Sequence, residues 1–476
     1  MSESIDKLLV RSGGSLGLAS FFEYGCRFLR TIILARLLTP DAFGLAALLV
    51  ACVAVAEALT EVGLREAVVQ NKHGREREFL STNWWLSLGR GMLIYVALWT
   101  LAPWVTKTFN QEHAVLMLRV GFLVTLLNAA TSPALHVLQK DFSFGKWVLL
   151  VQVSGVVGVV VAIVLGFITR SVWALIAGAV AESLCRCVLS FAVLPFRPML
   201  RISREYLKEI TTFSRGMFGL PILMVILMQT DTFVMGKLFT ASVLGIYSLA
   251  RDLADLPNKV LSRVISPLLL PTFSAQQEDL DGMRKRVIMV TELLVALGAP
   301  YTLFCILFGE PYLVTVYGNN VVGMAGAFSM LSAAILLQIL SSVIMNAFIG
   351  LGQPQVQRLA SLARTVSVLV IIYPLARYVG ASGVALAVLI SITIALSLQV
   401  SFARRILGLK LAEYLAPWWT GLRLCSFVIA AWVLVQFVVV ASWVAVLLGC
   451  AGFLTSWAIA CLRMEAFQRV RAALAR

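Results

Sequence analysis

Charged residues are scarce in this sequence. Asp, Glu, Lys and Arg make up 13% of the 476 residues, apolar residues make up 60%, and the mean hydropathy is +0.91. Soluble globular chains carry about 25% charged residues, so this composition excludes a soluble domain. The net charge of +15 does not indicate nucleic-acid binding, because multispanning proteins gather Lys and Arg in their cytoplasmic loops. We therefore predict an all-α polytopic membrane protein.

The sequence also lacks the residue spacing of a metal or disulfide site. Its eight cysteines lie inside apolar runs without a CxxC pair, and its three histidines are isolated. We expect free thiols, no metal and no cofactor. The segment from Met1 to Arg11 is short and polar, and the apolar run that follows carries charges at its centre. We expect a retained first span without a removable signal peptide.

No polar segment is long enough to fold as a catalytic domain outside the membrane, so we do not expect an enzyme. Apolar runs of about 20 residues are long enough to cross a bilayer. By that rule we predict fourteen transmembrane helices, at residues 12–38, 43–68, 80–105, 114–138, 145–168, 172–195, 209–238, 243–271, 285–308, 321–350, 356–378, 381–403, 416–440 and 442–462.

Basic residues alternate along the predicted connections. The even-numbered connections and both termini hold most of them, whereas the odd-numbered connections hold only Arg36, Lys107, Arg170, Lys237 and Arg377. Cytoplasmic loops carry the excess of Lys and Arg in membrane proteins. Both termini are therefore predicted to be cytoplasmic.

One stretch of sequence occurs twice. Residues 31–48 align without a gap with residues 232–249, so that Gly44 matches Gly245 at an offset of about 201 residues. Because six spans separate the copies, the two halves are predicted to be parallel six-helix repeats that face each other across a central cleft. The predicted domains are an N-lobe at 1–196, a cytoplasmic linker at 197–208, a C-lobe at 209–405, and two C-terminal helices with a tail at 406–476.

The predicted spans contain charges that cost about 2.5–3.5 kcal/mol each in lipid and should face protein or water. The ten basic residues are Arg27, Arg30, Arg90, Arg119, Arg186, Arg215, Arg251, Lys259, Arg263 and Arg423, and the eight acids are Glu23, Glu57, Glu61, Glu182, Asp231, Asp252, Asp255 and Glu292. Arginine is suited to bidentate capture of phosphate oxygens. The set therefore favours an anionic, phosphate-bearing substrate.

The first span places three of these charges on one face. Glu23, Arg27 and Arg30 have the spacing i, i+4, i+7. We expect this face to line the cleft, with Arg27 and Arg30 binding substrate and Glu23 serving gating or ion coupling. Glu23 and Arg27 could instead neutralise each other, whereas Arg30 has no acid at i±3 or i±4. Asp231 occupies the repeat position of Arg30, and an Arg30–Asp231 pair between the halves would act as a gate.

Two further groups of charges have alternative interpretations. On the eighth span, Arg251, Asp255 and Lys259 form a stripe that we expect to face the first span across the cleft, with Arg251 and Lys259 binding substrate and Asp255 serving gating or ion coupling. Asp255 and Lys259 could instead simply pair. On the second span, Glu57 and Glu61 are four residues apart and could form a proton or Na⁺ site, because close carboxylates raise each other's pKa. Pairing with Arg90 or Arg119 is the alternative for these two glutamates.

Several motifs resemble a known family. Ile33–Gly44, Gly63–Gln70, and Gln229–Gly236 with Leu244–Leu249 resemble the bacterial polysaccharide flippases of the multidrug/oligosaccharidyl-lipid/polysaccharide exporter superfamily. The resemblance implies a V-shaped, two-lobed transporter in the bacterial inner membrane. It would move undecaprenyl-pyrophosphate-linked oligosaccharides to the periplasmic leaflet for exopolysaccharide or O-antigen assembly.

The resemblance also implies site residues and partners. The family's cationic cavity would be formed here by Arg27, Arg30, Arg119, Arg215 and Arg251. The last two spans would form a groove for the lipid tail, in which Arg423 is the one buried charge. The partners would be the lipid-linked substrate, membrane lipid, a coupling H⁺ or Na⁺ ion, and other polysaccharide-assembly proteins.

Three other functions compete with this one. A cation-coupled drug exporter of the same superfamily would have acid-lined lobes and usually twelve spans. A membrane-bound polysaccharide polymerase or ligase would need a large periplasmic loop. A structural scaffold would have little reason to carry buried charge in both halves.

Overall fold

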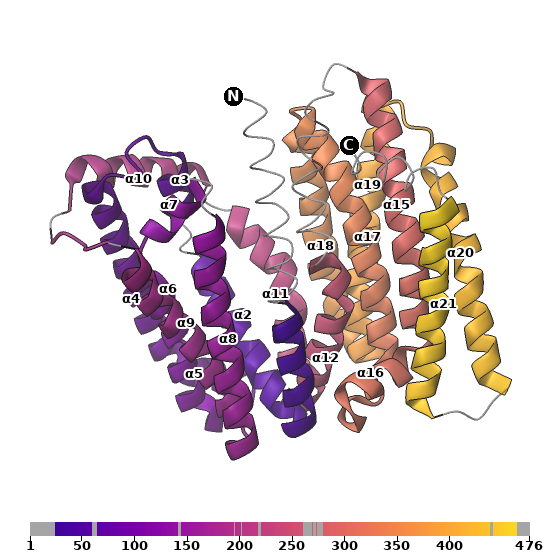
Figure 1. Cartoon of the computed structure of the whole chain (residues 1–476), viewed down its shortest axis with the longest axis horizontal. Helices are drawn as coiled ribbons and strands as arrows, with labels where there is room; N and C mark the ends of the chain where they lie inside the picture. Colours follow the sequence, from indigo (N-terminus) through magenta and orange to yellow (C-terminus); the bar gives the residue numbers. More distant parts are fainter. Residues whose placement is uncertain are drawn as a thin grey trace. The chain divides into compact units, whose positions relative to one another are not determined.

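The computed structural model describes residues 24–59, 64–140, 144–194, 196–200, 202–217, 220–259, 269, 273, 279–437 and 441–463. Throughout these ranges the regular elements are helices (Figure 1). Eleven of them are long and apolar enough to cross a membrane. The all-α membrane fold is thus confirmed. The count of fourteen stays a prediction, because the predicted first, seventh and eighth spans include residues outside the described ranges.

The chain forms two compact units, Met1–Gly245 (unit 1) and Ile246–Arg476 (unit 2). In unit 1 a helix at 24–37 precedes α2 (Pro40–Leu59), which begins with proline at its first turn, where the missing N–H costs nothing. The helices that follow are α3 (Leu64–Gln70), α4 (Arg77–Thr108), η1 (Glu112–Ala114), α5 (Val115–Gly121), α6 (Leu123–Ala130), α7 (Ala134–Lys140), α8 (Phe144–Thr169), α9 (Trp173–Val193), α10 (Arg204–Met217) and α11 (Leu220–Leu238). The element α12 (Ala241–Ala254) begins in unit 1 and continues into unit 2.

The two copies of the repeated motif meet inside unit 1. A methyl group added at Gly44 would lie 2.0 Å from the carbonyl oxygen of Ala241, and one added at Gly245 would lie 1.9 Å from the carbonyl oxygen of Pro40. The backbones of α2 and the start of α12 approach this closely only because both residues lack a Cβ. The glycines of the motif thus form a mutual contact between its two copies.

The predicted linker between the lobes is fastened to α4. The Arg77 guanidinium donates a hydrogen bond from Nε to the carbonyl oxygen of Arg197 at 3.1 Å. The backbone N–H of Met199 donates to the Ser81 hydroxyl at 3.0 Å, and the Trp85 indole N–H donates to the Met199 carbonyl oxygen at 2.8 Å. Side chains of α4 therefore satisfy the backbone of this irregular segment, as buried polar groups require.

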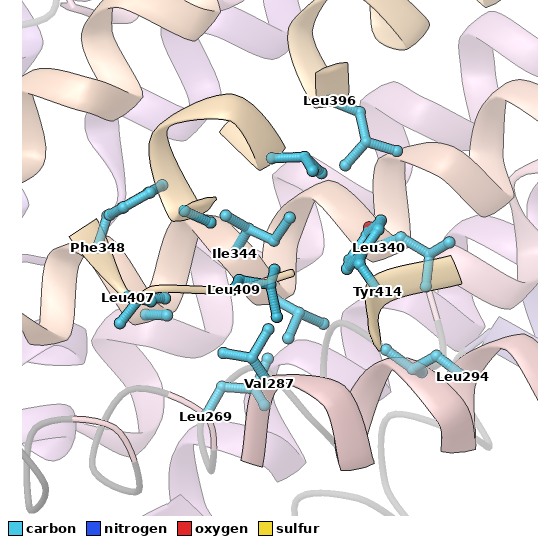
Figure 2. Close-up of a cluster of buried hydrophobic side chains, with 14 of the residues drawn as sticks. Leu269, Val287, Leu294, Leu340, Ile344, Phe348, Leu396, Leu407, Leu409 and Tyr414 are labelled. Carbon is cyan, nitrogen blue, oxygen red and sulfur yellow. The ribbon is translucent and has the colours of Figure 1, made fainter. Parts of the chain in front are cut away.

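Unit 2 contains a large apolar core. Its helices are α15 (Leu280–Leu307), α16 (Gly309–Tyr317), η2 (Asn319–Val321), α17 (Ala325–Gly350), α18 (Pro354–Val379), α19 (Ala381–Ile406), α20 (Leu411–Phe437) and α21 (Ser442–Arg463). Figure 2 shows Leu340, Ile344 and Phe348 of α17 packed in one buried cluster with Val287 of α15 and Leu396 of α19. Close-packed burial of this kind stabilises the unit.

The last two helices pack onto α15. The Trp457 indole N–H of α21 donates to the carbonyl oxygen of Leu297 at 2.7 Å. The ring of Phe304 lies 5.4 Å from that of Phe308 and 5.2 Å from that of Phe453, between ring centroids. The predicted domain boundaries stay predictions, but α20 and α21 share the packing of unit 2 (Figure 1).

Candidate functional site

One buried glutamate in unit 1 holds two arginines. Oε1 of Glu182 accepts a hydrogen bond from Nη2 of Arg27 at 2.5 Å and another from Nη2 of Arg186 at 2.6 Å. The Glu182 side chain is 11% exposed, and those of Arg27 and Arg186 are 32% and 25% exposed. We call these three residues the arginine–glutamate cluster. Its three groups bring two positive charges and one negative charge together inside a spanning bundle.

Local sequence explains the position of this glutamate. Glu182 and Arg186 are four residues apart on α9 and so share one face of the helix. A methyl group at Gly158 of α8 would lie 2.7 Å from the Cβ of Glu182, and one at Gly178 would lie 2.6 Å from the Cβ of Ala162. Small residues allow spanning helices to approach closely. The carboxylate is therefore fixed at the α8–α9 interface.

Arg27 reaches the cluster from a different helix. It lies in the helix at 24–37, and its Nη2 lies 4.0 Å from a methyl group built at Gly155 of α8. Sequence reasoning predicts Arg27 as a site residue but does not identify its partner. The suggested alternative partner, Glu23, lies outside the described residues. Arg27 thus has an interhelical ion pair with Glu182.

The other predicted residues of unit 1 differ in how deeply they are buried. Arg30 is half-buried, and Asp231 is buried with Oδ1 accepting from the backbone N–H of Thr232 at 2.8 Å. The proposed Arg30–Asp231 gate stays a prediction. The backbone carbonyl of Glu57 accepts from Nη2 of Arg90 at 3.0 Å. The ion site at Glu57 and Glu61 also stays a prediction, because Glu61 lies outside the described residues, as does the side chain of Arg215.

Arg119 is held by an aromatic ring. Its guanidinium lies 4.8 Å from the ring centroid of Trp99 on α4, and its Nε donates to the carbonyl oxygen of Trp99 at 3.3 Å. A cation over an indole face is attracted by the ring quadrupole. This contact positions Arg119 on the α4–α5 surface, and its role in a cationic cavity stays a prediction.

In unit 2 the acids outnumber the base in a second cluster. Nζ of Lys259 lies 3.1 Å from Oδ1 of Asp252 and 3.6 Å from Oδ2 of Asp255. The side-chain amide of Asn258 donates to Asp255 at 2.9 Å. We call Asp252, Asp255 and Lys259 the aspartate–lysine cluster. The simple pairing of Lys259 with Asp255 is therefore present, with Asp252 as a further partner, while Arg251 lies half-buried nearby in sequence.

Arg423 differs from the sequence prediction, because it is exposed rather than buried. The buried residues of α20 include Gly421, Leu424 and Cys425, and Arg423 points away from the face that they form. Its guanidinium lies 5.8 Å from the ring centroid of Trp419, one turn earlier. Hydropathy alone cannot tell which face of an apolar helix is outward, which explains the error.

Sequence reasoning does not select Glu182 and Arg186 as site residues. Their i, i+4 spacing within a span is the signal that could have identified them. All eight cysteines lie in the described part of the chain and are free. In that same part, no group of three His, Cys, Asp or Glu side chains could hold a metal ion.

Comparisons with known proteins agree on one type of protein. A family model described as "Polysaccharide biosynthesis protein" matches residues 33–326. The succinoglycan biosynthesis transport protein ExoT of Rhizobium meliloti is 26% identical over 314 residues, which cover 66% of this chain and 63% of that protein. The lipopolysaccharide biosynthesis protein WzxC of Escherichia coli is 22% identical over 305 residues, covering 64% of this chain and 62% of that protein. The chain thus spans less than two thirds of the length of these relatives.

Solved structures share the fold. The lipid II flippase MurJ in an inward closed conformation has a TM-score of 0.73 at 12% identity, covering 93% of this chain and 98% of that one. An inward-facing multidrug resistance transporter of the MATE family has a TM-score of 0.61 at 16% identity, covering 82% of this chain and 98% of that one. At these identities the likeness concerns the fold alone.

Proposed function

The chain belongs to the polysaccharide biosynthesis protein family, whose model matches more than half of it, and from this premise we propose that it is a lipid-linked oligosaccharide flippase. It moves undecaprenyl-pyrophosphate-linked repeat units across the bacterial inner membrane by alternating access, for exopolysaccharide or O-antigen assembly. Two of its relatives carry names that refer to succinoglycan transport and lipopolysaccharide biosynthesis. No enzymatic step is part of this function.

The arginine–glutamate cluster is the observation that carries the proposal. Its two guanidinium groups are partly shielded from water and are held within hydrogen-bond distance of one carboxylate oxygen. Such groups bind phosphate oxygens through short, charge-assisted hydrogen bonds. The net positive charge of the three groups suits a pyrophosphate headgroup, while the prenyl chain remains in lipid.

The remaining site residues complete the proposal. Arg30, Arg119, Arg215 and Arg251 would add positive charge along the path of the headgroup. Glu57, Glu61, Asp231 and the aspartate–lysine cluster would couple transport to H⁺ or Na⁺. Lys259 is engaged by two aspartates, so we assign it to coupling rather than to substrate binding. Both termini would be cytoplasmic, and other assembly proteins would hand over the substrate.

The drug-exporter alternative shares the fold, as the likeness to the MATE transporter shows. A cationic drug would, however, meet two arginines and one glutamate at the arginine–glutamate cluster. Like charges in a poorly hydrated site repel each other strongly. The cluster therefore favours the anionic substrate.

The experiment is a flipping assay in liposomes with a fluorescent prenyl-pyrophosphate-linked sugar. Arg27→Gln and Arg186→Gln should each lower the flipping rate at least tenfold while leaving the amount of folded protein unchanged. Arg377→Gln is the matched control, because Arg377 is exposed near the end of α18. Wild-type rates in both cluster variants, or no flipping by the wild type, would refute the proposal.

A further inference from the structure

The two arginines of the cluster share a single acceptor atom. Both Nη2 atoms bond to Oε1 of Glu182, so their separation is bounded at about 5 Å by the two hydrogen-bond lengths. Without the carboxylate, two guanidinium charges this close would repel each other. Glu182 thus holds the arginines together in the geometry that a compact anion would otherwise have to impose.

A purely structural ion pair would need one arginine rather than two. The second arginine leaves a positive charge on the three groups, and both arginine side chains are partly exposed, at 32% and 25%. A pyrophosphate offers more acceptor oxygens and more negative charge than Oε1 alone. An incoming headgroup can therefore take over the hydrogen bonds of the arginines.

Within the cluster, Glu182 is held in place by helix packing, whereas the Arg27 side chain can move. Glu182 cannot follow an arginine away, because its Cβ lies against Gly158 and its helix packs tightly on α8. Arg27 comes from a separate helix and carries a long side chain. When the substrate leaves, the carboxylate is still in place to bind Arg27 again.

From these contacts we infer that Glu182 is an internal competitor for the substrate phosphate. It holds Arg27 and Arg186 in the unloaded protein, yields them to the headgroup, and recaptures them to drive release. This inference rests on the proposed function, whose binding groups are the same arginines. Glu182 is thus a positioning residue that determines the rate of substrate release as well as the affinity for the substrate.

The test uses the purified full-length chain, with farnesyl pyrophosphate as the binding probe and the liposome assay as the transport probe. Glu182→Gln keeps the shape but removes the charge. It should tighten farnesyl pyrophosphate binding about tenfold and slow flipping about tenfold, because release becomes limiting. Glu182→Asp keeps the charge and should bind within about threefold of wild type. Glu112→Gln, at an exposed position in η1, should change neither quantity.

The outcomes separate the inference from the proposed function. If the wild type binds farnesyl pyrophosphate and Arg27→Gln does not, but Glu182→Gln binds no more tightly than wild type, the competitor role is wrong and the flippase stands. If the wild type and Arg27→Gln bind equally or not at all, the proposed function fails. Inorganic pyrophosphate should show the same tightening in Glu182→Gln, since the competition concerns phosphate oxygens.

A second variant covers the case in which Glu182→Gln does not fold. Arg186→Gln leaves the neutral pair of Arg27 and Glu182 and should bind farnesyl pyrophosphate at least tenfold more weakly than wild type. Adding Glu182→Gln to this variant removes the competing carboxylate charge from Arg27 and should restore binding to the wild-type level or better. A double variant that binds no better than Arg186→Gln would overturn the inference.

Discussion

The two compact units contain ion clusters of opposite charge balance. In unit 1, two arginines share one glutamate, whereas in unit 2 two aspartates share one lysine. Counting these groups alone, the first cluster has an excess positive charge and the second an excess negative charge. An excess cation suits an anionic substrate, and an excess carboxylate suits a transported cation. The difference suggests that the two clusters, rather than the two whole units, divide substrate binding and energy coupling between them.

The clusters also differ in how they are held. The carboxylate of unit 1 is wedged between two tightly packed helices, with Gly158 against its Cβ. The cluster of unit 2 is built from residues within one short stretch, in which Lys259 follows Asp252 by seven positions. Unit 2 also contains a large apolar cluster and, beside it, aromatic contacts such as the one between Phe304 and Phe453. The cluster of unit 1 thus depends on how separate helices pack, whereas the cluster of unit 2 forms between residues that are close in sequence.

The largest expected effect on transport comes from giving the unit 1 cluster the charge balance of the unit 2 cluster. Arg186→Glu would place two carboxylates around Arg27, so the pyrophosphate would meet net negative charge. We expect flipping to fall by at least about a hundredfold, equivalent to about 2.7 kcal/mol of lost stabilisation. Liposome flipping measures it, with Arg377→Glu as control. A variant that retains a tenth of the wild-type rate would contradict the comparison.

The next prediction concerns the contribution of aromatic packing to the stability of unit 2. Phe304→Ala removes a ring that is 1% exposed and lies 5.1 Å from Tyr312 and 5.2 Å from Phe453, between centroids. We expect a loss of about 3–5 kcal/mol in the free energy of unfolding. Denaturant unfolding of the purified protein measures it. Phe427→Ala, at a 40% exposed position, should cost far less, and equal losses would show that the aromatic cluster does not stabilise unit 2.

A smaller effect tests the proposed coupling in unit 2. Asp252→Asn with Asp255→Asn removes both negative charges around Lys259. We expect gradient-driven flipping to fall about tenfold while farnesyl pyrophosphate binding stays unchanged, because the arginines that we propose to bind the phosphate most directly, Arg27 and Arg186, belong to the other cluster. Asp281→Asn, 73% exposed at the start of α15, is the control. Weakened substrate binding in the double variant would mean that the two clusters do not divide the two tasks.

The smallest effect lies outside the spans, where His73, Glu76 and Tyr206 meet. Nδ1 of His73 lies 2.6 Å from Oε1 of Glu76, and the Tyr206 hydroxyl donates to Oε2 at 2.6 Å. The hydrogen bond with Glu76 raises the pKa of His73 above its ordinary 6.5. Hydrogen bonds from Tyr206 and then His73 lower the pKa of Glu76 below its ordinary 4.5, and Glu76 raises the pKa of Tyr206 to about 12.

These shifts define a pH window. The raised pKa of His73 gives stability that is complete below pH 6.5 and is lost as the pH rises through the folded value. The lowered pKa of Glu76 gives stability above pH 4.5 that is lost as the pH falls. Hydrogen exchange in α10 should therefore be slowest between pH 4.5 and 6.5, after correction for intrinsic rates. His73→Gln should remove the rise in exchange on the alkaline side, and an unchanged profile would show that this contact does not hold α10.

The sequence is sufficient to predict the helical class, while the role of Arg27 as a site residue stays a prediction. It is not sufficient to predict the partner of Arg27, because Glu182 lies 155 residues away and the pairing depends on how α8 and α9 pack. The exposure of Arg423 follows from which face of α20 is buried, and an apolar helix does not specify this in its hydropathy pattern. The match of Gly44 to Gly245 is visible in the sequence, but their mutual contact depends on how α2 packs against the start of α12.

The contact between Gly44 and Gly245 has a consequence for biosynthesis. The ribosome must add 201 residues after the first glycine before the second exists. At synthesis rates of about 5–20 residues per second, about 10–40 seconds pass between the synthesis of Gly44 and that of Gly245. Throughout that interval the surface of α2 around Gly44 lacks its later contact with the second copy of the motif. The order of translation thus makes this contact one of the last of unit 1 to close.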